Sequence, residues 1–288
     1  MNQTEAKGRN QLILSMCIFG TIGILRRYIS LSSSLIALVR GVIGAAFLVL
    51  VMAIGRRPLD KNAIRGNLWI LILSGTAIGF NWILLFESYN YTSVATATLC
   101  YYLAPILVIL AAPLVLKEKL TLRKGICTVV ALCGMILVSG VLESGFHGFS
   151  EMKGILFGIG AAVLYASVIL MNKTMKPIPA YDKTIVQLAV ASLALIPYVL
   201  LTEDLSLVTV TPLSAVLLLI AGVLHTGFAY QMYFGSMGSL QAHTVALFSY
   251  IDPILAIVLS MVILREPMSI LSAIGAVMIL GAAYISEK

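Results

Sequence analysis

Two apolar segments of this sequence are copies of one another, and each carries a proline in its interior. The segment from Tyr101 to Glu118 reads YYLAPILVILAAPLVLKE, and the segment from Tyr250 to Glu266 reads YIDPILAIVLSMVILRE. They align without a gap when Tyr102 is placed on Tyr250. The same register aligns further pairs, Gly79-Phe80 with Gly227-Phe228 and Lys117-Glu118 with Arg265-Glu266. A self-match at a fixed offset indicates an internal duplication.

The two prolines predict an interruption in each of these apolar segments. Pro105 has no N–H group, so the carbonyl of Tyr101 lacks its helical partner, and Pro253 does the same to Ser249. Membrane helices tolerate such kinks where neighbouring helices, polar side chains or water in a cavity bind the freed carbonyl. Matching proline-interrupted segments in the two halves of a chain point to the binding site of a transporter. We therefore expect helix kinks at Pro105 and Pro253, beside a cavity.

The composition identifies an integral membrane protein. Of the 288 residues 60% are hydrophobic and 11% are charged, whereas soluble domains are about 45–50% apolar and about 25% charged. The net charge of +7 comes from cations in short loops between apolar runs, so we expect no nucleic-acid partner. The cysteines lie inside apolar runs without metal-ligand spacing, so we expect no disulfide framework, metal site or cofactor: Cys17, Cys100, Cys127 and Cys133.

A membrane-spanning helix needs about 20 mostly apolar residues, and the sequence predicts ten such spans in an all-α fold. The first follows Lys7 and Arg9 without a small-residue cleavage site, so we read it as a retained helix and not as a signal peptide. The predicted spans are 12–30, 34–54, 67–88, 92–115, 123–141, 153–172, 184–201, 213–235, 241–263 and 269–286.

The distribution of lysine and arginine predicts the orientation in the cytoplasmic membrane. With the N-terminus inside, cytoplasmic loops carry most of the cations, and the outer side carries only Arg26, Arg27, Lys153 and Arg265. Both termini are then cytoplasmic. Each repeat, 12–141 and 153–286, holds five spans, and because five is odd the second repeat is inverted. Inverted repeats favour a central cavity that opens to one side of the membrane and then to the other.

The ordered motifs resemble the drug/metabolite transporter superfamily, in its ten-helix EamA-type branch. The resemblance rests on Tyr102-x-x-Pro105 and Tyr250-x-x-Pro253, on a glutamate ending each of those spans, and on the Gly-rich helix that follows each. Phe19-Gly20 stands where the family usually has Trp-Gly, and Arg40 matches a basic position common there. The resemblance implies transport of amino acids, amines or other small metabolites, commonly outward, and it extends over nearly the whole chain.

Charged and titratable groups at mid-membrane depth are candidate site residues, because a charge in a bilayer is costly unless it is paired or hydrated. Asp252, one residue before a proline, either binds a proton or a substrate ammonium, or fixes helix packing by a hydrogen bond. His225 either relays protons with Asp252 or is a neutral packing residue. Arg40 and Glu87 lie at similar depth, so we expect an ion pair. The alternative is an outer gate, or an arginine that receives a substrate carboxylate.

Aromatic side chains at the same depth are the predicted cavity walls. Their rings can stack on an apolar substrate or attract its cation. Tyr102 and Tyr250 are the strongest candidates, because the duplication brings them together. The full set is Trp82, Tyr101, Tyr102, Tyr165, Phe228, Tyr230 and Tyr250, with Asn81, Asn172, Gln187 and Gln231 as further polar candidates. Gln187 roughly matches Arg40 in the duplicate.

These features favour a secondary transporter of small organic metabolites that works by alternating access. The driving force is either the substrate gradient or protons acting through Asp252 or His225. An uncoupled facilitator is the alternative. An intramembrane enzyme would need a carboxylate pair, a zinc-binding helix or a Ser/His constellation, and the sequence contains none; nor does it contain a nucleotide-binding loop. The expected partners are a small-molecule substrate and the lipid bilayer, with the chain acting as a monomer or a homodimer.

Overall fold

Helices make up the regular structure of the chain in a computed structural model. The structure describes residues 3–92, 97, 100–138, 149–259, 262–263 and 269–286, and within these ranges there is no β-strand. The predicted ends of several spans therefore lie outside the described residues, as do Glu143, His147, Arg265, Glu266 and Lys288. An all-α architecture is what the apolar composition requires, because a helix satisfies every backbone polar group within its own segment.

Each predicted span overlaps at least one helix of the described residues. In chain order they are α1 (Gln3–Gly20), α2 (Ile22–Arg27), α3 (Ser33–Ile54), α4 (Lys61–Gly66), α5 (Leu68–Tyr91), α7 (Ala104–Val115), α8 (Leu122–Val138), α10 (Phe149–Thr174), α11 (Ala180–Thr202), α12 (Pro212–Ile220), α13 (Ala229–Ser236), α14 (Ala242–Phe248), α15 (Ile251–Leu259) and α16 (Ile270–Ser286). Five are long and apolar enough to cross a membrane, namely α3, α5, α10, α11 and the continuous run Pro212–Ser236. The first predicted span is different: α1 begins nine residues earlier, and the chain turns at Thr21 before α2.

Near both prolines of the duplicated segment, Pro105 and Pro253, the structure has a break, where the sequence predicted a kink within a helix. Turn residues Tyr102 and Leu103 precede α7, and Pro105 lies in the first turn of α7. In the second copy a turn at Ser249 and Tyr250 separates α14 from α15. Proline is well tolerated in the first turn, because the N–H that it lacks would have no intrahelical partner there.

A π-helical segment, η2 (Ala221–Phe228), interrupts the run between α12 and α13. Within it the Thr226 hydroxyl donates to the carbonyl of Ala221, five residues earlier, at 2.9 Å. Single π-helical turns inside α-helices frequently occur at functional sites. Here the segment carries His225, which faces the cavity described below.

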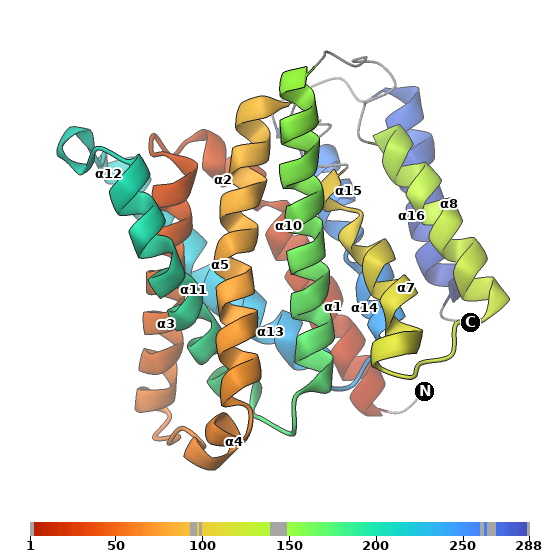
Figure 1. The fold of residues 1–288 in the computed structure, drawn as a ribbon, viewed down its shortest axis with the longest axis horizontal. Helices are drawn as coiled ribbons and strands as arrows, with labels where there is room; N and C mark the ends of the chain where they lie inside the picture. The colour runs from red at the N-terminus through yellow and green to blue at the C-terminus, as the bar shows by residue number, and fades with distance from the viewer. Residues whose placement is uncertain are drawn as a thin grey trace.

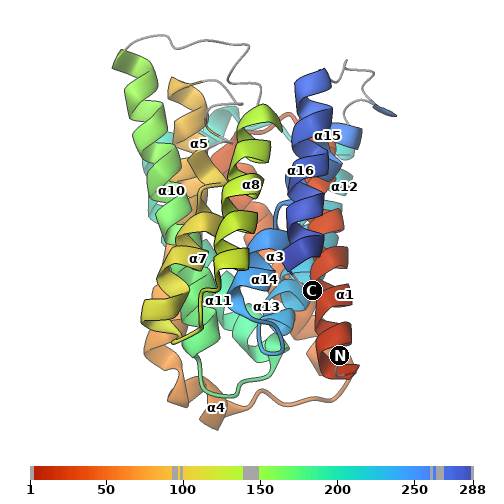
Figure 2. The ribbon, with the colours of Figure 1, turned by 90° about the vertical axis from the view of Figure 1, so that its right-hand side faces the viewer.

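The two halves of the chain interleave in space. Helix α1 packs against α13 and α15, and α10 packs against α5 and α7. Helices α3 and α11 pack together, while α8 and α16 form a pair of their own (Figure 1). The start of α1 and the end of α16 both point toward the side that carries α4, which we call the lower face (Figures 1 and 2). Helix α1 begins at this lower face, whereas α10 begins at the opposite, upper face.

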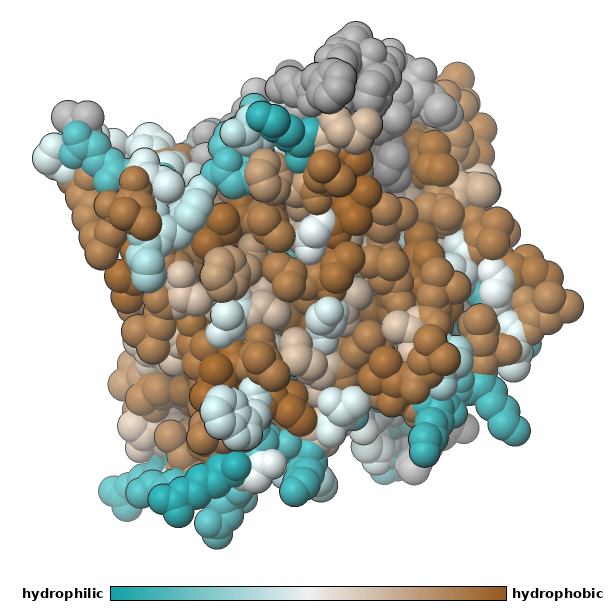
Figure 3. Space-filling view, in the orientation of Figure 1, coloured by the Kyte–Doolittle hydropathy of each residue, from teal (hydrophilic) through white to brown (hydrophobic). Residues whose placement is uncertain are grey.

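An apolar belt crosses the middle of the face shown in Figure 3. The space-filling view shows hydrophobic side chains across the centre and hydrophilic ones gathered along the lower edge and at the upper left (Figure 3). Glycines allow close helix contacts within the belt. A Cβ on Gly134 of α8 would lie 2.7 Å from the carbonyl oxygen of Gly275 on α16, so this pair can approach closely only without side chains.

At the lower face the turn between α13 and α14 is held by charged side chains of other helices. Both carboxylate oxygens of Glu118 accept from the backbone N–H of Ala242 at 3.1 Å, so Glu118 caps the start of α14. The Lys183 ammonium donates to the carbonyl of Phe234 at 2.8 Å, and Lys173 donates to those of Met237 and Leu240. These contacts hold the lower ends of α10 and α11 against the α13–α14 turn.

Candidate functional site

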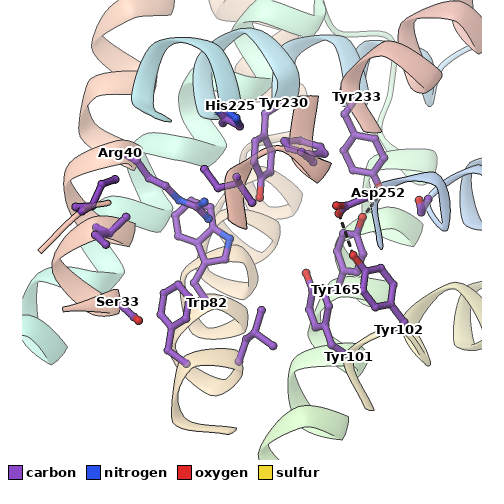
Figure 4. Close-up of a pocket in the computed structure, with 17 residues that line it drawn as sticks. Ser33, Arg40, Trp82, Tyr101, Tyr102, Tyr165, His225, Tyr230, Tyr233 and Asp252 are labelled. Atoms are coloured by element: carbon purple, nitrogen blue, oxygen red, sulfur yellow. Dashed lines mark hydrogen bonds between the residues drawn. The ribbon is translucent and has the colours of Figure 1, made fainter. Parts of the chain in front are cut away.

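A cavity of about 310 Å³ lies where the two broken helices meet α3, α5, α10 and the π-helical segment. Its volume is at the lower end of the range of about 300–1,000 Å³ that is usual for ligand pockets. Figure 4 shows Arg40 and Trp82 on one side of it, and Asp252 with Tyr101, Tyr102 and Tyr165 on the other. The complete lining is Phe19, Ile22, Ile29, Ser33, Ile36, Arg40, Trp82, Leu85, Phe86, Tyr101, Tyr102, Tyr165, His225, Tyr230, Tyr233, Ser249 and Asp252.

Aromatic rings form most of the wall between these two sides. Tyr101 stacks on Tyr165 with ring centroids 5.3 Å apart and planes 10° apart. Trp82 meets Tyr230 edge-on at 6.2 Å, and Phe19 meets the same tyrosine at 5.1 Å. Trp82 and Tyr230 occupy equivalent positions in the register that aligns Tyr102 with Tyr250. The duplication therefore contributes one large aromatic side chain from each half to the same wall.

The acidic side of the cavity joins the two copies. The Tyr102 hydroxyl donates to Oδ2 of Asp252 at 3.0 Å, and the Tyr250 hydroxyl donates to the backbone carbonyl of Tyr102 at 3.0 Å. Gly20 of α1 lies directly against this junction, because a Cβ there would come within 2.8 Å of the Asp252 carbonyl oxygen. Because Gly20 has no side chain, α1 approaches this junction closely enough for the neighbouring Phe19 to line the cavity.

The basic side of the cavity contains Arg40, for which the described residues provide no anionic partner. The Arg40 guanidinium lies over the Trp82 ring, with Cζ 4.6 Å from the ring centroid. Its Nε is buried and has no hydrogen-bond partner. Among the described residues no carboxylate forms an ion pair with it. His225 lies on the same side, with Nε2 2.7 Å from the hydroxyl oxygen of Thr21.

The predicted pair between Arg40 and Glu87 is not observed among the described residues. Glu87 accepts a hydrogen bond from the Tyr198 hydroxyl, while Arg40 faces the cavity over Trp82. Depth along a helix is readable from sequence, but the direction in which each helix turns its side chains is not. Two side chains at one depth can therefore point to different neighbours.

Six of the predicted substrate-binding residues lie on the cavity wall: Trp82, Tyr101, Tyr102, Tyr165, His225 and Asp252. Tyr250 does not line the cavity. Its side chain is 1% exposed, and its hydroxyl donates to the backbone carbonyl of Tyr102. Phe228 is 39% exposed and is not part of the lining, whereas Tyr230 is.

Two of the other polar candidates, Asn81 and Gln187, make structural contacts. Asn81 donates to the carbonyl of Ala161 at 2.7 Å, and the Gln187 amide donates to Ser74 at 2.6 Å. Asn172 lines a separate depression at the lower face. Gln187 therefore does not supply a second charged or cavity-facing group in the position that roughly matches Arg40.

Several lining residues were not predicted, and helical spacing could have identified some of them. Tyr233 follows Tyr230 by three residues, and Phe86 follows Trp82 by four, so each pair shares one helix face. The Tyr233 hydroxyl lies 2.8 Å from that of Tyr165 and connects α13 with α10. Ile29, in the loop before α3, and Ser33, the first residue of α3, carry no sequence signal for a cavity.

The comparison with known families matches nearly the whole chain. The EamA-like transporter family matches residues 7–140 and again residues 152–287. The chain belongs to the EamA-like transporter family. This family lies within the drug/metabolite transporter superfamily, so the resemblance of the duplicated motifs is confirmed.

Curated relatives of this EamA-family protein carry transporter names. An uncharacterised transporter of Bacillus subtilis, YxxF, is 29% identical over 93% of this chain and 86% of its own length. The protein PecM of Dickeya dadantii is 26% identical over 77% of this chain and 74% of its own length. One solved crystal structure superimposes with a TM-score of 0.85 at 18% identity, covering 97% of this chain and 96% of the other. That last likeness concerns the fold.

The EamA-family chain is therefore a membrane transporter, and its cavity is the natural candidate for the transport site. Within the described residues no group of three or more metal-binding side chains comes together. The cavity instead offers an unpaired cation, a carboxylate and aromatic rings. Such groups bind organic molecules by hydrogen bonds, ion pairs and stacking.

Proposed function

We propose that this protein is a secondary transporter that moves a small organic metabolite across the cytoplasmic membrane by alternating access. The observation that carries the proposal is the cavity at the junction of the two proline-interrupted segments, with Tyr102 of one copy bonded to Asp252 of the other. Transporter sites typically form where broken helices of two repeats meet near the bilayer midplane. The direction of transport that we propose is outward, as is common among proteins with these motifs.

The proposed architecture is ten spans in two inverted repeats, 12–141 and 153–286. The opposite directions of α1 and α10 support it (Figures 1 and 2). So does the packing, which pairs α1 with α13 and α15 in the same way that it pairs α10 with α5 and α7. If the first repeat is exchanged with the second, the contacts of α1 with α13 and α15 become the contacts of α10 with α5 and α7. A twofold axis that relates two inverted repeats requires this correspondence.

The cavity and the lower face together describe one state of the proposed cycle. The lining extends from Asp252 to Ser33, at the upper start of α3, and Ile29, in the loop before α3, whereas the lower ends of the helices are tied together by Glu118 and Lys183. We propose that both termini and α4 are cytoplasmic, because positively charged loops favour that side. The structure then corresponds to a state closed towards the cytoplasm.

Reconstituted transport is the direct test of this function. Purified protein in proteoliposomes should accelerate the flux of at least one amino acid, amine or related metabolite over protein-free liposomes. A preceding thermal-shift screen against such compounds selects the solutes. If an imposed proton gradient drives net movement, Asp252 or His225 is the expected coupling group; if it does not, the protein is an uncoupled facilitator. Hydrolysis of a tested solute without its movement would favour an intramembrane enzyme and overturn the proposal.

A further inference from the structure

A group of exposed cations lies on the lower face between α3 and α5, away from the cavity (Figures 1 and 2). Within the described residues, none of their side chains forms a hydrogen bond or an ion pair. Asp60, the only acid of this segment, is already occupied, because its Oδ1 accepts from the backbone N–H groups of Asn62 and Ala63 at the start of α4. A fifth exposed cation comes from the loop between α10 and α11. The full set, which we call the α4 basic patch, is Arg56, Arg57, Lys61, Arg65 and Lys176.

The two arginines of the α4 basic patch that follow α3 leave this helix in a fixed direction. The Arg56 N–H donates to the carbonyl of Ala53 at 3.1 Å. The Arg57 N–H donates to the carbonyl of Met52 at 3.0 Å, and Arg56 has a left-handed backbone with φ 49°. This is the Schellman arrangement that ends many helices, and it satisfies the last carbonyls of α3. The backbone that carries both guanidinium groups is therefore held by the end of the helix.

Two buried polar side chains tie α4 to the second half of the chain. The N–H of Asp60 donates to Oδ2 of buried Asp182 at 2.9 Å. Buried Asn67 donates to the carbonyls of Ala63, at 2.9 Å, and Lys176, at 3.3 Å, and its Oδ1 accepts from the N–H of Lys176 at 2.8 Å. These contacts bring Lys176 to the end of α4. Because the five cations stand on an anchored backbone, less conformational entropy is lost when they bind a ligand together.

The α4 basic patch lies at the boundary between the apolar belt and water. Figure 3 shows hydrophilic side chains directly below the hydrophobic ones along the lower edge of the molecule. The helix ends on either side of the patch carry exposed apolar side chains. Ile54 at the end of α3 is 74% exposed, and Trp69 at the start of α5 is 77% exposed. Tryptophan at a helix end is typical of the headgroup level of a bilayer, so the cations beside it lie at the depth of the lipid phosphates.

We propose that the α4 basic patch binds the phosphate headgroup of an anionic phospholipid in the cytoplasmic leaflet. The choice of leaflet rests on the orientation given with the proposed function. A guanidinium binds two phosphate oxygens through parallel N–H donors, and an ammonium adds a point charge. A zwitterionic lipid carries the same phosphate but also a cation, which the patch repels. The patch therefore selects a lipid with net negative charge, whose acyl chains lie against Trp69 and Leu68.

Lipid titration of the purified full-length protein in a neutral detergent tests this site. Short-chain phosphatidylglycerol and phosphatidylcholine with identical acyl chains are the two lipid probes. Inorganic phosphate and a peptide of glutamates are titrated in parallel, because a free anion or an acidic protein would also be attracted to cations. Phosphatidylglycerol should bind about tenfold or more tightly than each of the other three probes, and added salt should weaken its binding.

Two double variants separate this site from the general positive charge of the lower face. Arg56→Gln/Arg65→Gln should weaken binding of phosphatidylglycerol about tenfold or more, since each cation near an anionic lipid changes affinity about fivefold. Lys117→Gln/Lys119→Gln is the matched control. It also removes two exposed cations, one of them with a left-handed backbone at φ 56°, but from the segment between α7 and α8. The control should bind the lipid within about twofold of the unaltered protein, and thermal unfolding checks that both variants are folded.

Each other outcome contradicts the lipid site. Equal affinity for the two lipids would mean that the patch does not select an anionic headgroup. Equal losses in the two double variants would mean that only the net charge of the lower face matters. Phosphate or the acidic peptide binding as tightly as phosphatidylglycerol would assign the patch to a free ion or to an acidic protein. None of these measurements requires transport, so their failure leaves the proposed function intact, and a protein that binds the lipid but moves no solute loses only the proposed function.

Discussion

The hydroxyl of Tyr102 donates a hydrogen bond to the carboxylate of Asp252 at 3.0 Å, and this contact joins the two copies of the duplicated segment. The residues stand three and one positions before equivalent prolines. Each therefore lies where its proline has interrupted a helix, with backbone and side chain directed at the same chamber. The contact gives the cavity a polar group shared by both halves, which relative movement of the halves would alter.

Asp252→Asn should abolish proton-driven transport. An amide keeps the size of the side chain and one acceptor for Tyr102, but it cannot exchange a proton. We expect flux driven by a proton gradient in proteoliposomes to fall to the level measured without the gradient, with an unchanged elution profile on size exclusion. Full proton coupling in this variant would remove Asp252 from that role, and His225→Gln would then be measured in the same way.

The two equivalent tyrosines should respond differently to loss of their hydroxyl groups. Tyr250→Phe removes the donor to the Tyr102 carbonyl in a buried location, so we expect a loss of about 1 kcal/mol in stability and little change in ligand affinity. Tyr102→Phe removes a group on the cavity wall and should change affinity severalfold. Thermal unfolding and ligand titration of both variants check this. Equal effects on affinity would place Tyr250 in the site after all.

Gly20→Ala should destabilise the junction between α1 and the second broken helix. The added Cβ would lie 2.8 Å from the carbonyl oxygen of Asp252, which is backbone and cannot rotate away. We expect a cost of about 1–3 kcal/mol, typical of overpacking, and weaker ligand binding. Gly125→Ala is the control, because no atom lies within 4 Å of its added Cβ and alanine favours a helix. A Gly20→Ala protein as stable as the control would contradict the close approach.

Glu118→Gln should loosen the lower face. The variant loses the negative charge at the start of α14 and one of two oxygens that accept from the Ala242 N–H. Loss of a helix cap costs about 0.5–2 kcal/mol, so hydrogen exchange at the first amides of α14 should accelerate while α5 and α11 are unaffected. Glu5→Gln, on an exposed part of α1, should leave this exchange unchanged. Unaltered exchange in Glu118→Gln would show that the cap does not restrain the turn.

Most helix positions and an interruption near each of the two prolines follow from sequence alone, because they depend on local chemistry, although the structure has breaks where the sequence predicted kinks. An apolar run of sufficient length must be helical in lipid, and Pro105 and Pro253 interrupt it wherever the rest of the chain lies. The membrane class follows from the apolar composition, and the family was indicated by the resemblance of the duplicated motifs. Sequence also proposed Asp252 and Tyr102 as site residues, and in the structure both line the cavity and are joined by a hydrogen bond.

Only the tertiary structure decided which neighbour each side chain meets. Glu87 contacts Tyr198 and not Arg40, and Tyr250 lies behind the cavity wall although it is the copy of Tyr102. These outcomes depend on the rotation of each helix about its axis, and that rotation is set by packing against segments distant in the chain. Sequence predicted that Arg40 pairs with Glu87, but the packing of α3 and α5 leaves its guanidinium over Trp82, and no carboxylate of the described residues forms an ion pair with it.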